Sequence, residues 1–380
     1  MLSDIDDQDS HRFQIRGLHI YRCDDSMQEK DPVRVIRESL AKALVLYYPL
    51  AGRLKEGPNR KVIVDCTGEG VLFVEGDADV ILEELDDSLH PPFPCFNELL
   101  YETPGSSELL NCPVLQIQFM FAVGEIARAA VAPSIPPVWE RHLLNGGNPP
   151  VITCDHHEYD HATAAVGTIM PTNNLVHRSF FFGPTQISAL KRFISDDLHC
   201  SRFDIVTACI WRCRTMALRL GHEEDFRLIC IVNARSKFSP PLPLGYYGNA
   251  LGYPAARTTA GKLSQNPLEY AVKLVKETKV KVTEEYMKSK VDLIVSRRRP
   301  NVNTVRSLLV SDLTRAGFRE VDFGWGKAEF RGPANGEAIR SFYIPWKNKE
   351  GIAVPVCLPA PVMDSFVKEI NRMLTDATAA

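Results

Sequence analysis

A histidine and an aspartate stand four residues apart in the stretch His156-His157-Glu158-Tyr159-Asp160. An imidazole titrates near neutral pH, so it can accept the proton of a hydroxyl group that acts as a nucleophile. In this interpretation His156 is the general base and Asp160 is the carboxylate that orients it. Chance offers an alternative interpretation. With ten histidines in the chain, a four-residue coincidence in a solvated linker is unremarkable.

The same stretch could also supply metal ligands. His157 and His161 are four residues apart, and Cys154 lies close to them. Zinc prefers nitrogen and sulfur ligands, usually four in a structural site. No helix is expected here to bring the two histidines onto one face, and no distant fourth ligand is apparent. We therefore predict no metal site.

The pentapeptide Asp322-Phe323-Gly324-Trp325-Gly326 predicts a sharp turn held in place by a large aromatic ring. Glycine can adopt positive φ angles that other residues rarely adopt, and tryptophan covers a large apolar area. The carboxylate at the front of the turn could belong to an acid catalyst or to a structural contact.

The elements that position these residues alternate between helix and strand. Asp31 and Pro32 suit the N-cap and first position of a helix that ends near residue 47. Residues 61–65 and 71–75 resemble a β-hairpin, and residues 114–119 a strand that runs into a helix over 120–130. Prolines and two adjacent glycines make residues 131–175 the best candidate for a linker.

The second half repeats the alternation. Residues 175–182 and 227–235 are predicted strands, and Ser201 with Asp204 forms a predicted capping box for the helix that follows. A long helix is expected over roughly 266–296. We expect two further strands over 339–346 and 352–358, and a closing helix over 361–374.

Composition limits the possible functions. Hydrophobic residues make up 45% of the chain and charged residues 24%, which is typical of globular proteins. A net charge of −3 without a basic block argues against binding to nucleic acid or to an anionic membrane. No apolar run is long enough to span a bilayer. The acidic start and ten cysteines without a CxxC pair predict reduced thiols and a cytoplasmic protein.

Three further motifs precede the pentapeptide in the chain: Tyr47-Tyr48-Pro49-Leu50-Ala51-Gly52-Arg53-Leu54, Val232-Asn233-Ala234-Arg235-Ser236 and Gly245-Tyr246-Tyr247-Gly248-Asn249. Together with residues 322–326 they resemble, in sequence and order, the motifs of the plant BAHD acyltransferases. That family moves an acyl group from coenzyme A onto an alcohol or an amine. Proline-rich stretches at 91–95 and 136–140 are similar to those of the alcohol-acylating branch, which includes benzyl alcohol O-benzoyltransferases and alcohol acyltransferases.

The resemblance implies an α/β protein with the two-domain fold of chloramphenicol acetyltransferase. The N-terminal domain would cover 1–142, a crossover linker 143–174 and the C-terminal domain 175–380. Acyl-coenzyme A and a small alcohol would enter a channel between the domains, where a histidine acts as the base that allows an ester to form. No permanently bound cofactor is implied, and a monomer is expected.

The resemblance also assigns roles to residues. It implies that Asp322 is structural and forms an ion pair with Arg235, and that Trp325 packs in the core. Tyr247, Gly248 and Asn249 would line the channel or form a purely structural loop.

The catalytic motif of the family, HxxxD, is missing from its expected place. It should follow the strand predicted at 114–119, but Gln118 runs directly into Phe119, and no histidine lies between His90 and His142. The flanks resemble the family, so we predict an internal deletion near 118–119 that removes a central strand and the base. The family also implies a strand ahead of residues 2–6. An alternative function is therefore a catalytically impaired relative, or an incomplete gene product, that keeps the fold.

Overall fold

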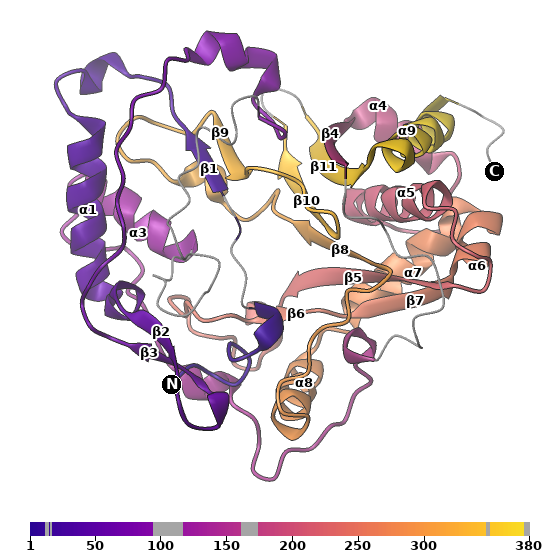
Figure 1. Ribbon diagram of the computed structural model, residues 1–380, viewed down its shortest axis with the longest axis horizontal. Helices are drawn as coiled ribbons and strands as arrows, with labels where there is room; N and C mark the ends of the chain where they lie inside the picture. Colours follow the sequence, from indigo (N-terminus) through magenta and orange to yellow (C-terminus); the bar gives the residue numbers. More distant parts are fainter. Residues whose placement is uncertain (12–14, 16, 94–116, 161–173, 347–349, 376–380) are drawn as a thin grey trace.

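Figure 1 shows the computed structural model of the chain, in which residues 1–11, 15, 17–93, 117–160, 174–346 and 350–375 are described. The described helices are α1 (Pro32–Leu46), α3 (Ile117–Ala127), α4 (Pro184–Lys191), α5 (Arg202–Ala217), α6 (Ala260–Gln265), α7 (Leu268–Val280), α8 (Glu284–Ser296) and α9 (Ala360–Thr375). The strands are β1 (Gly17–Ile20), β2 (Arg53–Glu56), β3 (Val62–Asp65), β4 (Leu175–Phe182), β5 (Asp225–Asn233), β6 (Leu251–Gly252), β7 (Ala255–Thr259), β8 (Ser307–Asp312), β9 (Phe330–Pro333), β10 (Arg340–Pro345) and β11 (Ile352–Pro359). Short 3-10 turns include η1 (Asp9–His11) and η7 (His157–Tyr159).

A seven-stranded mixed sheet forms the centre of the second half of the chain. Its strand order is β4-β11-β10-β8-β5-β6, with β7 also paired to β5. The β10–β8 and β8–β5 pairs are parallel, and the others are antiparallel. Every residue of β11 is buried, as expected for a strand inside such a sheet.

Helices cover one face of this sheet and bury the largest hydrophobic core. Figure 1 shows α4, α5, α7 and α9 gathered on the same side of the molecule. Trp211 from α5 and Phe366 from α9 are fully buried there, together with Leu228 and Val310 from β5 and β8. Burying such side chains stabilises the fold by roughly 1.5–3 kcal/mol for each aliphatic or aromatic group.

The first half of the chain contributes the α1 and α3 pair, the two-stranded sheet of β2 and β3, and strand β1. Strand β1 pairs with β9, so Gly17 lies opposite Pro333 and Ile20 opposite Phe330. Residues of α1 and α3 also share a hydrophobic cluster with Val321. The two predicted domains are therefore joined by packing as well as by the chain, and their boundaries at 142 and 175 stay a prediction.

Helix α1 begins as the sequence predicts. The Asp31 side chain accepts a hydrogen bond from the backbone N–H of Val33 at 3.0 Å, and Pro32 occupies the first helical position. The predicted hairpin of 61–65 with 71–75 is wrong. Strand β3 pairs with β2 instead, and residues 71–75 form no strand.

The strand predicted over 114–119 is also wrong where the structure describes it. Residues 117–119 already belong to α3, while 114–116 lie outside the described residues. Phe119, Ala122, Val123 and Ile126 are buried at helical spacing against α1. Packing against α1 therefore favours a helix here, although the alternating pattern of these residues by itself favours a strand.

The helix predicted over 266–296 is divided in two. Helix α7 ends at Val280 and α8 begins at Glu284, where the Thr283 hydroxyl accepts a hydrogen bond from the backbone N–H of Tyr286 at 3.1 Å. Threonine favours such a cap over a place within a helix, which explains the break. None of the described helices is long and apolar enough to cross a membrane.

Candidate functional site

The pentapeptide forms the turn that the sequence predicts. Oδ1 of Asp322 accepts hydrogen bonds from the backbone N–H groups of Gly324 at 2.7 Å and Gly326 at 2.9 Å. Both glycines have positive φ, +110° and +77°, where a side chain would be strained. Phe323 is 3% exposed and meets the ring of Tyr21 edge-on at 5.4 Å. The aspartate thus braces its own turn from within.

The predicted ion pair between Asp322 and Arg235 is wrong. Oδ2 of Asp322 lies 3.8 Å from Nη1 of Arg128, just beyond the end of α3. Arg235 donates instead to the backbone carbonyl oxygens of Gly248 at 2.7 Å and Tyr246 at 3.5 Å. Since the turn packs against α3, its nearest cation comes from the residue that follows this helix, and the partly exposed pair adds little to stability.

Replacing Gly124 with alanine should destabilise the protein by more than about 1 kcal/mol, although alanine is the better helix former by about that amount. An added Cβ would lie 2.7 Å from the backbone oxygen of Asp322, which cannot move without opening the turn. The change in the free energy of unfolding can be measured by urea denaturation. Gly76→Ala is the control, because its Cβ would meet nothing within 4 Å. Equal stability of the two variants would contradict this close packing.

The loop at 245–249 is packed between the two halves of the chain. Tyr247 is 3% exposed, stacks on Trp139 at 4.5 Å and meets Tyr47 edge-on at 5.1 Å. The side-chain oxygen of Asn249 accepts a hydrogen bond from the N–H of Leu251 at 3.1 Å. These contacts hold the loop in place. A role of Tyr247, Gly248 and Asn249 in lining a channel stays a prediction.

His156 does not pair with Asp160. Its ring is buried, with Nε2 2.9 Å from the hydroxyl of Ser289 and Nδ1 3.2 Å from Oε1 of Glu158. The hydroxyl of Tyr286 also donates to this buried carboxylate. Both ring nitrogens are therefore engaged in a structural network, and His156 cannot approach a substrate hydroxyl. The catalytic interpretation of the 156–160 pattern is wrong for this arrangement.

The neighbouring histidine, His157, pairs with Asp160 in place of His156. Nδ1 of His157 lies 2.9 Å from Oδ2 of Asp160 across the 3-10 turn η7, with both side chains partly exposed. A 3-10 turn aligns residues three apart, which favours this pair over one four apart. Asp160 also lies 3.4 Å from the guanidinium of Arg257 and borders an open cavity of about 660 Å³.

No group of three described histidine, cysteine, aspartate or glutamate side chains could hold a metal ion. Cys154 is partly buried, and His161 lies outside the described residues.

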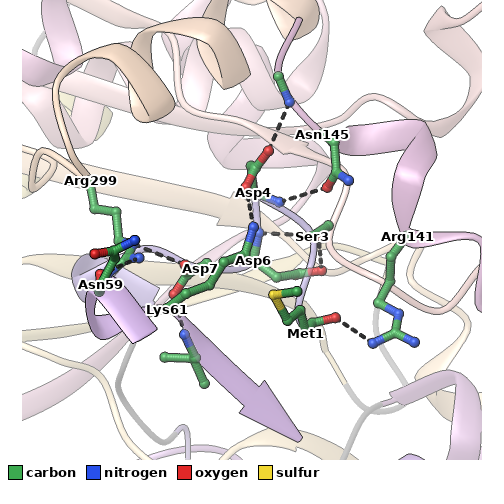
Figure 2. Close-up of polar contacts among 12 residues, drawn as sticks. Met1, Ser3, Asp4, Asp6, Asp7, Asn59, Lys61, Arg141, Asn145 and Arg299 are labelled. Carbon is green, nitrogen blue, oxygen red and sulfur yellow. Dashed lines mark hydrogen bonds and ion pairs between the residues drawn. The ribbon is translucent and has the colours of Figure 1, made fainter. Parts of the chain in front are cut away.

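The acidic N-terminal segment ties distant parts of the chain together, a feature that the sequence analysis missed. Figure 2 shows its polar contacts. Asp4 pairs with Lys61 at 2.5 Å and accepts a hydrogen bond from the backbone N–H of Gly146 at 2.9 Å. Asp7 pairs with Arg299 at 2.9 Å. Three carboxylates at 4, 6 and 7 were the signal that could have revealed this role.

Two titratable side chains of this segment, Asp6 and His11, are partly buried. Burial raises the pKa of Asp6 to about 6, although the backbone N–H of Asn249 donates to its Oδ1 at 3.1 Å. Burial, and then the charge of Lys290, lowers the pKa of His11 to about 3. The His11 ring therefore stays neutral at physiological pH and is a poor proton acceptor.

His19 is equally unsuited to take a proton. It lies on β1, where its Nε2 accepts a hydrogen bond from Nε of Arg331 at 2.7 Å. Burial and the charge of Arg331 lower the pKa of His19 to about 3. A general base needs a pKa near the working pH. His11 and His19 therefore do not supply one, and both ring nitrogens of His156 are already engaged.

Comparison with known proteins gives consistent results. A model described as Transferase family matches residues 1–120 and 116–373, so its two segments meet around residues 116–120. A protein from Nicotiana tabacum named Benzyl alcohol O-benzoyltransferase is 56% identical, covering 98% of this chain and 89% of its own length. Alcohol acyl transferase 1 allele GSd from Malus domestica is 47% identical with the same coverage of both chains.

Solved structures show the same fold at low sequence identity. Vinorine synthase gives a TM-score of 0.64 at 20% identity, covering 94% of this chain and 90% of its own. TRI101 of F. graminearum, complexed with coenzyme A and deoxynivalenol, gives 0.72 at 14% identity, covering 96% and 95%. The expected α/β fold of the acyltransferase type is therefore confirmed, and the structure adds that its central sheet is mixed.

Proposed function

The chain belongs to the Transferase family, the BAHD acyltransferases, and on that premise we propose that its substrates are an acyl-coenzyme A and a small alcohol. In the reaction the hydroxyl oxygen attacks the thioester carbonyl, its proton passes to a base, and coenzyme A leaves as the thiol. The product is an ester. The observation that carries this proposal is the 56% identity, across 98% of the chain, to a relative named for benzoyl transfer to benzyl alcohol. A benzoyl-like or acetyl-like acyl group is the donor class we propose.

A second candidate is a relative that keeps the fold and its ligands but turns over slowly. Two observations favour it. The two segments of the family match overlap at residues 116–120, the region that contains Gln118 and Phe119. The stretch aligned with the tobacco relative has 409 residues, more than the 380 of this chain, so that relative holds residues without a counterpart here. Both support our inference that the segment carrying HxxxD is absent from this chain.

We further propose that residues 1–142 and 175–380 are the two domains, joined by the linker 143–174, with Tyr247, Gly248 and Asn249 beside the channel between them. The eight described cysteines are all free thiols, which supports a reducing compartment such as the cytoplasm. We expect a monomer without a permanently bound cofactor.

Binding of the donor can be tested separately from turnover. Isothermal titration of the purified chain with coenzyme A and benzoyl-coenzyme A should give saturable binding, with a Kd between about 1 μM and 1 mM, the range of typical enzyme–substrate KM values. ATP is the control for nonspecific nucleotide binding. If neither coenzyme A nor benzoyl-coenzyme A binds to a protein that melts cooperatively, the acyl-coenzyme A proposal is overturned. Binding without turnover would favour the impaired relative.

A further inference from the structure

Residues 146–155, which we call the strap, are attached to α8 by side chains alone. None of the strap's backbone groups forms a backbone–backbone hydrogen bond with another described residue. Asp292 of α8 accepts hydrogen bonds from the backbone N–H of Gly147 at 2.6 Å through Oδ1 and from that of Val151 at 2.8 Å through Oδ2. Most residues of the strap are exposed, so the strap depends on such side-chain contacts to stay in place.

Ser289 is the second attachment point, three residues before Asp292 on the same helix. Its side chain is buried, and its hydroxyl oxygen accepts hydrogen bonds from the backbone N–H groups of Thr153 and Cys154, both at 3.0 Å. Nε2 of His156 lies 2.9 Å from the same oxygen. A hydroxyl group has two lone pairs and one proton. Because the two backbone donors occupy both lone pairs, the hydroxyl proton must be donated to Nε2.

The other contacts of His156 agree with this position of the proton. When Nε2 accepts, the neutral ring carries its own proton on Nδ1, which lies 3.2 Å from Oε1 of Glu158. The hydroxyl of Tyr286 donates to the same oxygen. Burial, and then the charge of Glu158, raises the pKa of Tyr286, so this hydroxyl keeps its proton. The hydrogen bonds of the network are therefore all satisfied when His156 is neutral.

A proton added to His156 must bind to Nε2, which then becomes a donor. The oxygen of Ser289 would face three donors with only two lone pairs, and its own proton would lose its acceptor. At least one of the N–H groups of Thr153 and Cys154 must then lose its hydrogen bond. We propose that His156 and Ser289 form a proton-operated latch, which holds the strap on α8 while His156 is neutral and releases residues 152–155 when it is protonated.

Charged groups from three segments act on this latch. Glu158 belongs to the turn η7 that follows His156, and its carboxylate favours a protonated ring. Lys290 of α8 is fully buried, interacts with the same carboxylate and opposes a second positive charge there. Asp6 of the N-terminal segment in turn acts on Lys290. Because Glu158 lies against Nδ1, a protonated His156 keeps a counter-ion in the interior, where an unpaired charge would be costly.

The release should be local. Asp292 still holds Gly147 and Val151 when His156 gains a proton, so only the second part of the strap, residues 152–155, loses its attachment. These residues lie within the linker that we propose to join the two domains, and their release would loosen the hold of α8 on that linker. The latch depends only on contacts within the chain, so it holds whether or not the chain transfers acyl groups.

Hydrogen–deuterium exchange of the full chain at pH 7.5 and pH 5.5, measured by mass spectrometry, tests the latch. An ordinary imidazole gains its proton across this range. Protection factors remove the intrinsic effect of pH on exchange. They should fall about 2- to 10-fold over residues 152–155, the factor that corresponds to one net hydrogen bond. Protection over residues 147–151, held by Asp292, and over the buried strand β11 should change less.

Three variants assign the effect to the latch. His156→Gln keeps an acceptor for the hydroxyl of Ser289 but cannot gain a proton, so protection over residues 152–155 should no longer depend on pH. Ser289→Ala should show, already at pH 7.5, protection at least as low as that of the wild type at pH 5.5. His157→Gln is the matched control, because this partly exposed neighbour contacts Asp160 instead. It should respond to pH as the wild type does.

Protection over residues 152–155 that is the same at both pH values in the wild type, or that falls equally in His156→Gln, would overturn the latch. A pH response that disappears in His157→Gln would also overturn it, because the proton would then act on that histidine. If His156→Gln does not fold, Ser289→Ala decides alone. Protection as high as that of the wild type at pH 7.5 would mean that the hydroxyl of Ser289 does not hold the strap.

Discussion

The 380-residue chain should form benzyl benzoate from benzoyl-coenzyme A and benzyl alcohol at least about 100-fold more slowly than the tobacco relative, because general acid–base catalysis contributes about 10²- to 10⁴-fold. His11 and His19 have pKa values lowered to about 3, and both ring nitrogens of His156 are engaged. The rate of ester formation under identical conditions can be measured by gas chromatography.

Two variants identify any base that the linker supplies. His156→Ala should destabilise the protein, because Ser289 and Glu158 lose their buried partner, but should not change the turnover of the folded fraction. His157→Ala removes the exposed histidine that pairs with Asp160. Turnover equal to that of the relative, and abolished by His157→Ala, would contradict the loss of the base and place it in this turn.

Inserting the missing segment distinguishes two causes of slow turnover, the loss of the base and damage to the fold. The segment that the tobacco relative carries at this position can be inserted between Gln118 and Phe119 of this chain. Turnover should rise by about 100-fold or more if the inserted histidine acts as the base. The same insert with alanine at that histidine is the matched control. It should restore packing without restoring ester formation.

Lys290→Met should stabilise the protein by about 2 kcal/mol or more at pH 6. Lys290 is fully buried on α8, and burial lowers its pKa to about 7. Its ammonium donates to the carbonyl oxygen of Leu251 at 2.9 Å and lies 4.2 Å from the ring centre of Tyr253. Below pH 7 the folded protein must keep this ammonium charged in the interior. Methionine has a similar shape and carries no charge.

The lowered pKa of Lys290 also predicts how the free energy of unfolding changes with pH. In the folded state Lys290 loses its proton near pH 7, whereas the unfolded chain keeps it up to about pH 10.5. Between these values the unfolded chain binds more protons, so the free energy of unfolding should rise with pH by up to roughly 1.4 kcal/mol per unit. The charges of Glu158 and Asp6, which face the ammonium, raise its pKa but less than burial lowers it.

Denaturant unfolding of the wild type and Lys290→Met between pH 6 and 9 measures both effects, and the advantage of methionine should shrink as the pH rises. Lys288→Met is the matched control on the same helix, because its side chain is 68% exposed and pairs with Glu284 on the surface. That variant should change stability by less than about 0.5 kcal/mol at every pH. Parallel pH profiles for the wild type and Lys290→Met would mean that Lys290 keeps an ordinary pKa.

Local features of this fold were predictable where neighbours in the chain decide them. The cap at Asp31, the capping box at Ser201 and the glycine turn at 322–326 all depend on contacts within five residues. The partner of β3 was not predictable, because two flanking segments, 53–56 and 71–75, could both pair with it. Helix α3 was partly missed because its first residues alternate like a strand until they pack on α1.

The sequence by itself determined the family and the class of the fold, since ordered motifs along a chain suffice for these, and it predicts a gap between Gln118 and Phe119. Only the tertiary structure decided which charges meet. Asp322 pairs with Arg128 rather than Arg235, and His156 binds Ser289 rather than Asp160. His19 and Arg331 lie 312 residues apart in the chain and yet form one hydrogen-bonded pair. Such pairs depend on how distant strands and helices pack, and the spacing of residues in the sequence does not predict which side chains then lie within contact distance.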